Sequence, residues 1–522
     1  MENLFFGLDL STQQLKLTVV DENSKVILEE SVNFDKELPE YGTKNGVIAN
    51  GNIITSPTLM WVAAVDRLFT KLQSVGFPFR YVKAVSGAGQ QHGSVYWRNN
   101  AANILANLDP SQSLVTQLSN CFSILDSPTW QDSSTTQECR QLESIVSGPE
   151  MLAKLTGSKA YERFTGNQIA KIYRHNRQAY DETERISLVS SFLATLFLGK
   201  YAQIDVSDGS GMNLLNIYTK EWDNRLLEAC GGSELRQKLG EPEKDGFKII
   251  GKISEYFIKR YGFDCECMIL PFMGDNPSSL LSLRLESGDI VISLGTSDTV
   301  LLLTNQADPN TESHTLCHPI DPNTYISMLC YKNGSLTREY IRDVYANKSW
   351  NKFNEILLSY PHPHENKIGF YFRIQEITPF AHGIHRFVNQ ELVEEFDDPK
   401  YNARAILESQ FMSMRIRTEK LMSDKEWKRI IAIGGASENT EILKVLTDVF
   451  GVDVWRYSGK NSAGYGAALK ALMTTFRNAN SSSSMSDLFM IADPSSENTL
   501  IYERMLNIYQ QLELRVLNHN QI

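Results

Sequence analysis

Two segments far apart in the sequence each place a threonine where a predicted strand turns back on itself. The first hairpin spans Phe6–Lys16 and carries Thr12 in its polar turn. The second hairpin spans Asp289–Thr299 and carries Thr296. At such turns backbone N–H groups and hydroxyls converge without a bulky side chain, which suits the binding of phosphate. Because each half of the chain holds one copy, the pair predicts a duplicated fold whose halves face each other across a polyphosphate.

A third segment places a carboxylate at the end of an apolar stretch. Gly274-Asp275-Asn276-Pro277 follows Leu270–Met273, and a helix is expected to begin at Pro277. The segment lies just before the second hairpin, where the first half of the chain should give way to the second. A carboxylate there could accept the proton of a substrate hydroxyl that attacks a γ-phosphate. The alternative is that Asp275 only caps the helix.

A glycine-rich loop follows the predicted strand Tyr81–Ser86 and reads Gly87-Ala-Gly89-Gln-Gln-His92-Gly93. It is not a dinucleotide fingerprint, because its last glycine comes one residue late and the next residues, Ser94–Trp97, favour a strand instead of a helix. Gln91 and His92 place many hydrogen-bond donors and acceptors in a short span, which suits a sugar. The simpler alternative is a flexible glycine turn.

A second glycine loop, Ala432–Asn439, follows the short apolar strand Arg429–Ile433 and precedes a predicted helix at Glu441–Phe450. Two adjacent glycines let a flat ring or a phosphate approach the backbone amides closely. A plain strand-to-helix turn would have the same sequence. The small residues of Ser462–Ala468 are interpreted as close helix packing.

The elements between these segments alternate between strands and helices. Val19–Glu30 continues the first β meander, and Ser56–Leu72 has helical periodicity with Trp61, Val65 and Leu68 on one face. Such a mixed order favours α/β sheets covered by helices on both faces. The serine-rich stretch Asn478–Ser486 is interpreted as a solvated loop or linker.

Composition limits the class of protein. A chain of 522 residues exceeds what one hydrophobic core usually supports, so two domains are expected, and 42% hydrophobic residues supply both cores. The net charge of −11 argues against a nucleic-acid partner or an acidic membrane surface. Met1-Glu2-Asn3 does not resemble a secretory signal, and Phe192–Leu198 is too short to span a bilayer. Seven cysteines without a signal suit reduced thiols in the cytoplasm.

Three groups of metal-ligating residue types are interpreted as structural, because none is accompanied by a second ligand pair. They are Cys265 with Cys267, His314 with Cys317 and His318, and His382 with His385.

Taken in order, these segments resemble the carbohydrate kinases named for their Phe-Gly-Gly-Tyr (FGGY) signature, within the sugar kinase, heat-shock protein and actin superfamily. The resemblance implies an α/β fold of two actin-like (ribonuclease H-like) domains with a deep interdomain cleft. It implies a sugar-binding domain at 1–285 with the first hairpin, and an ATP-binding domain at 286–522 with the second. The matching segments run from end to end: Asp9–Lys16, Gln90–Gly93, Arg163–Lys171, Asp205–Leu215, Gly274–Asn276, Ser293–Thr299 and Gly434–Asn439.

The resemblance also implies a role for each matching position. The residues expected to bind a ketose are Gln91, His92, Arg163, Asp275 and Asn276, with Asp275 also acting as general base. Asp9 resembles the carboxylate that holds Mg²⁺, through water. The residues expected to bind ATP are Thr12, Gln13, Lys16, Gly295, Thr296, Gly435, Ala436 and Asn439, with Trp350 as a wall of the adenosine site.

Some positions depart from the family pattern. Ser11 stands where many relatives have glycine, and Arg174 stands where a tryptophan is usual near Lys171. Asp132, after Trp130-Gln131, either faces the sugar or caps the elements that follow it.

Within the family the motifs most resemble those of eukaryotic xylulokinases. The expected reaction is therefore in-line transfer of the γ-phosphoryl of ATP to D-xylulose, which gives D-xylulose 5-phosphate. Three alternatives remain: a kinase of another ketose such as ribulose or a heptulose, a catalytically silent sugar- or nucleotide-binding regulator, and an actin-like assembling protein. The motifs do not indicate an oligomeric state.

Overall fold

The computed structural model describes residues 3–519 apart from 287, 423–426, 458–461 and 477–487. The chain divides into two compact units. Unit 1 holds the chain up to Leu285, the segment Thr315–Tyr325 and the later segment that carries one helix, Ala463–Thr475. Unit 2 holds most of the remainder, from Glu286 onward. The serine-rich stretch 478–486 lies outside the described residues, so its interpretation as a loop stays a prediction.

Unit 1 is built on a mixed sheet. Its strand order is β12 (Gly251–Lys252), β13 (Met268–Ile269), β6 (Val82–Gly89), β1 (Leu4–Leu10), β2 (Gln14–Val20) and β3 (Val26–Asn33), with β14 (Met273–Gly274) also paired to β6. β1 runs antiparallel to β2 and parallel to β6. The first hairpin and the meander that follows it are thus confirmed.

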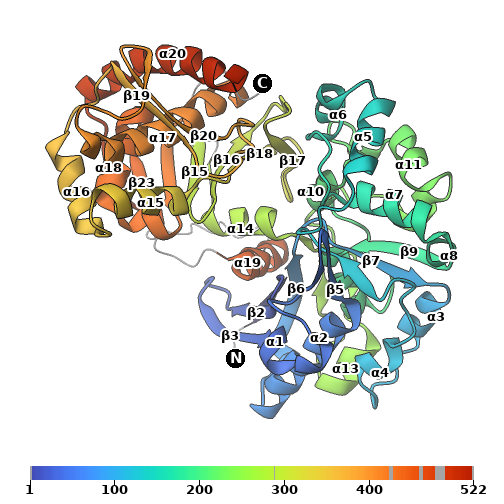
Figure 1. Cartoon of the computed structure of the whole chain (residues 1–522). Helices are drawn as coiled ribbons and strands as arrows, with labels where there is room; N and C mark the ends of the chain where they lie inside the picture. Colours follow the sequence, from blue (N-terminus) through green and yellow to red (C-terminus); the bar gives the residue numbers. More distant parts are fainter. Residues whose placement is uncertain (1–2, 287, 423–426, 458–461, 477–487, 520–522) are drawn as a thin grey trace. The chain divides into compact units, whose positions relative to one another are not determined.

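Both faces of β1 are buried, because its side chains alternate between two layers of helices. Phe6, Leu8 and Leu10 belong to a large core that includes residues of α2 (Thr58–Ser74), α9 (Val189–Leu198) and α13 (Glu255–Tyr261). Phe5 belongs to a smaller core with α19 (Ala463–Thr475). Figure 1 shows α19 on one side of the blue strands and α2 on the other. Asp9 has the same parity as Phe5, so it lies on the α19 face.

The other elements of unit 1 are shorter. Its small sheets are β4 (Ile48–Asn50) with β5 (Ile53–Pro57) and β8 (Asp126–Pro128), β7 (Ser94–Arg98) with β9 (Thr183–Leu188), and β10 (Leu215–Asn216) with β11 (Glu221–Trp222). Its further helices are α1 (Phe34–Glu37), α3 (Ala101–Ala106), α4 (Leu114–Leu118), α5 (Thr136–Ile145), α6 (Pro149–Thr156), α7 (Thr165–His175), α8 (Arg177–Asp181), α10 (Val206–Gly209), α11 (Asn224–Gly231), α12 (Leu235–Leu239) and α14 (Asp275–Leu283).

Glycines let α19 lie against the backbone of β1 and α14. A Cβ atom on Gly7 of β1 would lie 1.9 Å from the carbonyl oxygen of Gly464. A Cβ atom on Gly466 would lie 1.7 Å from the carbonyl oxygen of Ser278, in α14. Backbone cannot yield as a flexible side chain can, so a larger residue at either position would force these elements apart. The predicted close helix packing of Ser462–Ala468 is confirmed, and it fixes the two elements that carry Asp9 and Asp275.

Replacing Gly466 with alanine should lower the free energy of unfolding by about 1–3 kcal/mol, because the added methyl group forces α19 and α14 apart. Urea denaturation of the purified variant measures the change. Met473→Ala is the matched control, since Met473 lies on the same helix and is 39% exposed, and it should change stability by less than about 0.5 kcal/mol. Equal effects of the two substitutions would contradict the packing argument.

Unit 2 repeats the central topology of unit 1. Its main sheet contains β18 (Tyr325–Tyr331), β16 (Asp298–Thr304), β15 (Asp289–Leu294), β22 (Arg429–Ile433), β23 (Val454–Tyr457) and β24 (Leu488–Ala492) in that order. β15 pairs antiparallel with β16 and parallel with β22, just as β1 pairs with β2 and β6. The predicted duplication is therefore confirmed at the level of strand topology. It also makes the glycine loop after β6 and the glycine loop after β22 topological equivalents.

The turns of the two hairpins differ in length. In the first hairpin Leu10 pairs with Leu15, whereas in the second Leu294 pairs with Asp298, so the second turn is one residue shorter. The remaining elements of unit 2 are β19 (Lys367–Phe372), β20 (Gly383–Val388) and β21 (Glu391–Val393), and the helices α15 (Ser335–Tyr345), α16 (Trp350–Ser359), α17 (Asn402–Leu421), α18 (Thr440–Phe450) and α20 (Ser496–His519).

Several sequence expectations can be checked against these bounds. The predicted helices at Ser56–Leu72 and Glu441–Phe450 correspond to α2 and α18 within two residues, and Arg429–Ile433 matches β22. All seven cysteines are free, as predicted. Among the described residues no helix is long and apolar enough to cross a membrane, and no group of three or more His, Cys, Asp or Glu side chains could hold a metal ion.

Candidate functional site

Asp9 lies at the end of β1 and is 6% exposed. It pairs across the hairpin with Lys16, whose side chain is exposed. Burial raises the pKa of Asp9, although a hydrogen bond from Ser11 and the charge of Lys16 act in the opposite direction. Its Oδ1 atom is buried and has no hydrogen-bond partner within the described part of the chain. An unpaired, buried carboxylate oxygen fits a hard cation or a water bound to one.

The turn of the first hairpin holds its threonine hydroxyl in a defined orientation. The indole Nε1 of Trp130 donates to the Oγ1 of Thr12 at 2.9 Å. The same hydroxyl donates to the side-chain carbonyl oxygen of Gln90 at 3.5 Å, which is a long hydrogen bond. Gln13, the next residue, is exposed. Sequence reasoning did not assign Trp130 a role, because only its neighbour Asp132 drew attention.

The loop after β6 carries His92 in a left-handed backbone conformation, with φ at 72°. Its Nδ1 lies 2.9 Å from the carbonyl oxygen of Gly211, and its ring stacks on Phe164. Burial, and then the positive charge of Arg163, lowers the pKa of His92 to about 3. The ring is therefore neutral near pH 7, and its one proton must lie on Nδ1 to satisfy the carbonyl. Nε2 is left as a hydrogen-bond acceptor, which suits a substrate hydroxyl.

Arg163 and His92 meet at the same aromatic ring. The Arg163 guanidinium lies 4.8 Å from the centre of the Tyr161 ring and 5.6 Å from that of Phe164. Phe164 in turn stacks on His92 with ring centres 4.5 Å apart. The structure thus brings together two residues of the predicted ketose set that lie far apart in the sequence.

Asp275 is the first residue of α14, and Gly274 occupies the cap position before it. The expected helix start at Pro277 and the alternative of Asp275 as the cap are both wrong by a small margin, because helical backbone already begins at Asp275. Burial, followed by the negative charge of Asp9, raises the pKa of Asp275 to about 7. A carboxylate with this pKa is well suited to accept a proton near neutral pH.

Asn276 links the helix start to the glycine loop. Its side-chain amide donates to the Oε1 of Gln91 at 2.9 Å. Because Gln91 adjoins His92, the side chains predicted to bind the ketose form one connected group in unit 1.

Asp208 is a buried carboxyl group beside this set that sequence reasoning missed. Its Oδ2 accepts a hydrogen bond from Ser190 Oγ at 2.5 Å. Burial, and the charges of Asp205 and Asp275, raise its pKa to about 8, partly offset by hydrogen bonds from Ser190 and Gln91. The signal for it in the sequence is weak. Asp208 lies within the segment Asp205–Leu215, which resembles the family as a whole without singling out Asp208.

Asp132 is held entirely by protein groups. Its Oδ1 accepts from Ser134 and from the Gln168 amide at 2.7 Å, and its Oδ2 accepts from the backbone N–H of Ile54 at 2.9 Å. These contacts favour the structural interpretation of Asp132 over a role in sugar binding, although it orders the loop rather than capping a helix.

In unit 2 the turn of the second hairpin presents Thr296 to solvent, and Gly295 beside it is half-buried. The Gly295 carbonyl oxygen accepts from the backbone N–H of Ser335 at 2.8 Å, at the start of α15. Asp298, which closes the turn, is fully buried against Arg338.

The predicted adenosine residues meet at the start of α18. Gly434 has a φ of 86° and lies against the backbone of Leu294, whereas a Cβ atom on Gly435 would meet nothing within 4 Å. Asn439 caps α18 and donates to Asn354 Oδ1 at 2.9 Å. Asn354 lies one helical turn after Trp350 on α16, so these residues share a face of that helix. The residue missed by sequence reasoning is Asn354, because a lone asparagine inside a helix gives no signal.

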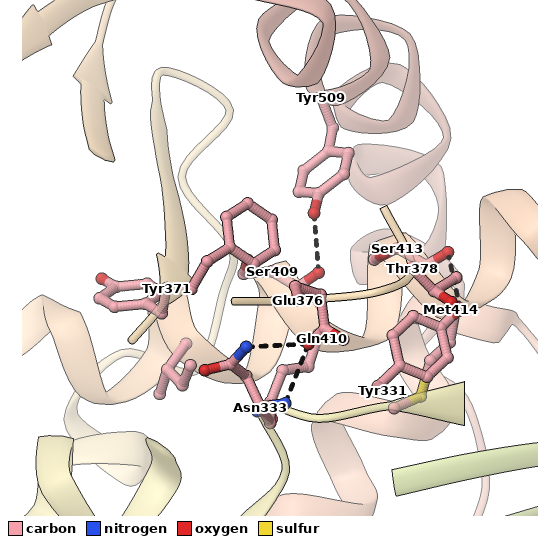
Figure 2. A pocket seen from close by; sticks show the side chains of 12 residues that line it. Tyr331, Asn333, Tyr371, Glu376, Thr378, Ser409, Gln410, Ser413, Met414 and Tyr509 are labelled. Atoms are coloured by element: carbon pink, nitrogen blue, oxygen red, sulfur yellow. Dashed lines mark hydrogen bonds between the residues drawn. The ribbon is translucent and has the colours of Figure 1, made fainter. Parts of the chain in front are cut away.

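A small buried cavity of about 20 Å³ also lies in unit 2, and none of the predicted site residues lines it. Figure 2 shows its polar wall, where the Asn333 side-chain amide donates to Glu376 and the Tyr509 hydroxyl donates to the carbonyl oxygen of Ser409. The Gln410 side-chain amide donates to the backbone carbonyl oxygen of Asn333. The volume is that of roughly one water molecule. A sugar or nucleotide does not fit there.

The chain is similar to known proteins over nearly its whole length. The N-terminal domain model of the FGGY family of carbohydrate kinases matches residues 4–282, and the C-terminal domain model matches residues 290–475. A xylulose kinase from Mus musculus is 47% identical over 98% of this chain and 94% of its own. Xylulose kinase 2 from Arabidopsis thaliana is 46% identical over 90% of this chain and 87% of its own.

Solved structures agree on the fold. The crystal structure of a xylulose kinase from Rhodospirillum rubrum superposes with a TM-score of 0.82 at 12% identity, over 100% of both chains. Two domain models of the same family match the chain, and the relatives named above are nearly half identical to it. The chain belongs to the FGGY family of carbohydrate kinases.

Proposed function

We propose that this carbohydrate kinase transfers the γ-phosphoryl group of ATP to the terminal hydroxyl of D-xylulose and releases D-xylulose 5-phosphate. The observation that carries the proposal is Asp275, a half-buried carboxylate with a pKa of about 7 next to the Asn276–Gln91–His92 group. The names of the relatives at 46–47% identity support the choice of substrate. The similarity covers 98% of this chain for the Mus musculus relative and 90% for the Arabidopsis thaliana relative.

In the proposed reaction the ketose lies against the connected polar group of unit 1. His92 accepts a hydrogen bond from one hydroxyl through Nε2, and Asn276 and Arg163 donate to others. Asp275 orients the terminal hydroxyl and takes its proton as the oxygen attacks the γ-phosphorus. Because phosphoryl transfer leaves little covalent work to the protein, positioning and electrostatics should supply most of the rate.

ATP is assigned to the residues that the resemblance implies. Thr12, Gln13, Lys16 and Thr296 would hold the phosphates, while Gly435, Ala436 and Asn439 would bind the adenosine, with Trp350 nearby. Asp9 would hold Mg²⁺ through water, and its unpaired Oδ1 fits that role. When bound, Mg²⁺ supplies positive charge to the phosphate oxygens. We also place the reaction in the cytoplasm, which the free cysteines favour.

A second candidate function is phosphorylation of another ketose, such as ribulose or a heptulose, because one fold serves many substrates. A coupled assay of ADP release across a panel of ketoses separates the two. We expect the highest kcat/KM with D-xylulose and a product that carries phosphate on C5 by ³¹P NMR. A higher kcat/KM for another ketose would identify that ketose as the substrate. No ADP release with any sugar would favour a catalytically silent regulator.

Replacing His92 with asparagine should raise the KM for the ketose by about tenfold, because one hydrogen bond to a hydroxyl is lost while the left-handed backbone is tolerated. The KM for ATP should change by less than twofold. Since the pKa of His92 is about 3, the ring does not titrate near neutrality, and the variant should keep the pH profile of the wild type. A changed acid limb would show that the ring, not Asp275, controls that titration.

A further inference from the structure

The turn of the second hairpin is exposed, but the residue that closes it is completely buried. Leu294 pairs with Asp298 at the end of the hairpin, and Asp298 is the first residue of β16. The Arg338 guanidinium donates to both carboxylate oxygens of Asp298, from Nη1 at 2.6 Å and from Nη2 at 3.0 Å. Both side chains are 0% exposed. Among the described residues, this bidentate ion pair is therefore the only contact through which charged side chains join the turn to α15.

Stability alone is a poor explanation of this ion pair. Removing two charges from water costs several kcal/mol per ion, and well-packed apolar residues often serve as well or better. Arg338 pays an additional cost, because its buried Nε has no hydrogen-bond partner in the described residues. What a planar bidentate pair supplies is a fixed orientation of both side chains. The pair therefore fixes where β16 begins relative to α15.

Gln410 of α17 extends the anchor to a third element. Its Oε1 accepts from Arg338 Nη1 at 2.8 Å, and its Nε2 donates to the carbonyl oxygen of Asn333 at 2.6 Å. Glu376 fixes Asn333 in turn, accepting from its backbone N–H and from its side-chain amide, both at 2.9 Å. Figure 2 shows Asn333, Gln410 and Glu376 around the small cavity. These hydrogen bonds hold the loop 332–334 against α17.

The loop 332–334 lies directly against Gly295 and Thr296, the turn residues of the second hairpin. A Cβ atom on Gly334 would lie 2.6 Å from the carbonyl oxygen of Thr296 and 2.8 Å from that of Gly295. The backbone N–H of Ser335 donates to Gly295. Any shift of the loop would therefore move both turn residues.

The first hairpin is held in a different way. Trp130 fixes the Thr12 hydroxyl, and the residue that closes that turn by pairing with Leu10 is Leu15, which is not an acid. Among the described residues, no hydrogen bond of this kind is made by the Thr296 side chain. The backbone of the second turn must therefore be positioned by the residues packed against it.

We propose that Asp298, Arg338 and Gln410 form a bracket that positions Gly295 and Thr296 for the phosphates of ATP. They are positioning residues, since none of them lies on the exposed side of the turn. The proposal rests on the proposed ATP-binding role of that turn. It does not depend on which sugar is phosphorylated.

The test removes both charges together, so that no unpaired charge is left in the core. The double variant Arg338→Met/Asp298→Leu should remain folded by circular dichroism. Its KM for ATP and its Kd for ADP, measured by calorimetry without sugar, should both rise by about tenfold or more. The KM for the ketose should change by less than twofold. Arg338→Lys, which keeps the charge but loses the bidentate geometry, should give a smaller rise in the same two constants.

A second buried ion pair in unit 2 provides the matched control. Arg404 and Glu408 of α17 are 3% and 2% exposed and lie 2.8 Å apart, but they contact Tyr502 and not the turn. Arg404→Met/Glu408→Leu should leave the KM for ATP and the Kd for ADP within twofold of the wild type. The bracket would be refuted by an unchanged ADP affinity in the folded Arg338→Met/Asp298→Leu or Arg338→Lys variant, or by equal losses in the control. A wild type that bound ADP normally but phosphorylated no ketose would instead refute the proposed function alone.

Discussion

Replacing Asp275 with asparagine should lower kcat by about 10²- to 10⁴-fold, the usual contribution of a general base. The amide keeps the size of the side chain and can still accept the hydrogen bond from the backbone N–H of Asn276, which lies 2.8 Å from Oδ1. It cannot accept a proton from the substrate. Steady-state kinetics with coupled detection of ADP measures the loss, and an unchanged Kd for ADP would show that the site is otherwise intact.

The pH profile gives an independent test of the same residue. Burial raises the pKa of Asp275 from 3.8 to about 7, so the carboxyl group is protonated below that value. The base is the ionised form, and kcat/KM should therefore fall as the pH drops through about 7. Asp275→Asn should lose this acid limb along with most of its activity. Asp126→Asn serves as the control, because Asp126 is exposed in unit 1, and it should keep both the rate and the limb. A near-wild-type kcat in Asp275→Asn would remove Asp275 from the role of base.

Much of the fold could be predicted because the chain repeats one strand pattern. The two hairpins share a turn threonine and apolar strands, and the apolar run Arg429–Ile433 predicts β22 as a strand, although not its pairing with β15. The return of α19 to unit 1 was not predicted as a topological feature. Its contacts are made by Gly464 and Gly466 against distant backbone, and a glycine in a helix shows its partner only in three dimensions. Sequence patterns report local periodicity, whereas this packing depends on residues hundreds of positions apart.

The site was predictable only where residue types are unusual. Asp275 and His92 stand beside glycines, which mark loops that approach a ligand. Asp208, Trp130 and Asn354 were missed because nothing in the sequence marks them, and only the structure shows their hydrogen bonds to Ser190, Thr12 and Asn439, respectively. A residue that only supports a site residue can be of almost any polar type, so its identity in the sequence gives little indication of its position in the site. The assignment of roles to the predicted residues stays a prediction until the variants are measured.

Asp9→Asn should lower kcat by about 10²-fold or more, because a metal ion at the phosphates contributes several kcal/mol and Asp9 is proposed to hold it. The Mg²⁺ concentration that gives half the maximal rate should rise, and chelation of Mg²⁺ should stop the wild-type reaction. The physical basis is the buried, unpaired Oδ1 of Asp9, which an amide would replace with a weaker ligand or a donor. Asp9→Glu keeps the charge and should be less impaired.

A second readout separates loss of the metal ligand from general damage. The negative charge of Asp9 is one of the causes that raise the pKa of Asp275. Removing that charge should lower the pKa of Asp275 and move the acid limb of kcat/KM to lower pH, even though the rate itself falls. Misfolding would depress the rate at every pH without moving the limb. An unmoved limb together with an unchanged Mg²⁺ dependence would mean that Asp9 neither holds the metal nor faces the base, and both carboxylates would then need different roles.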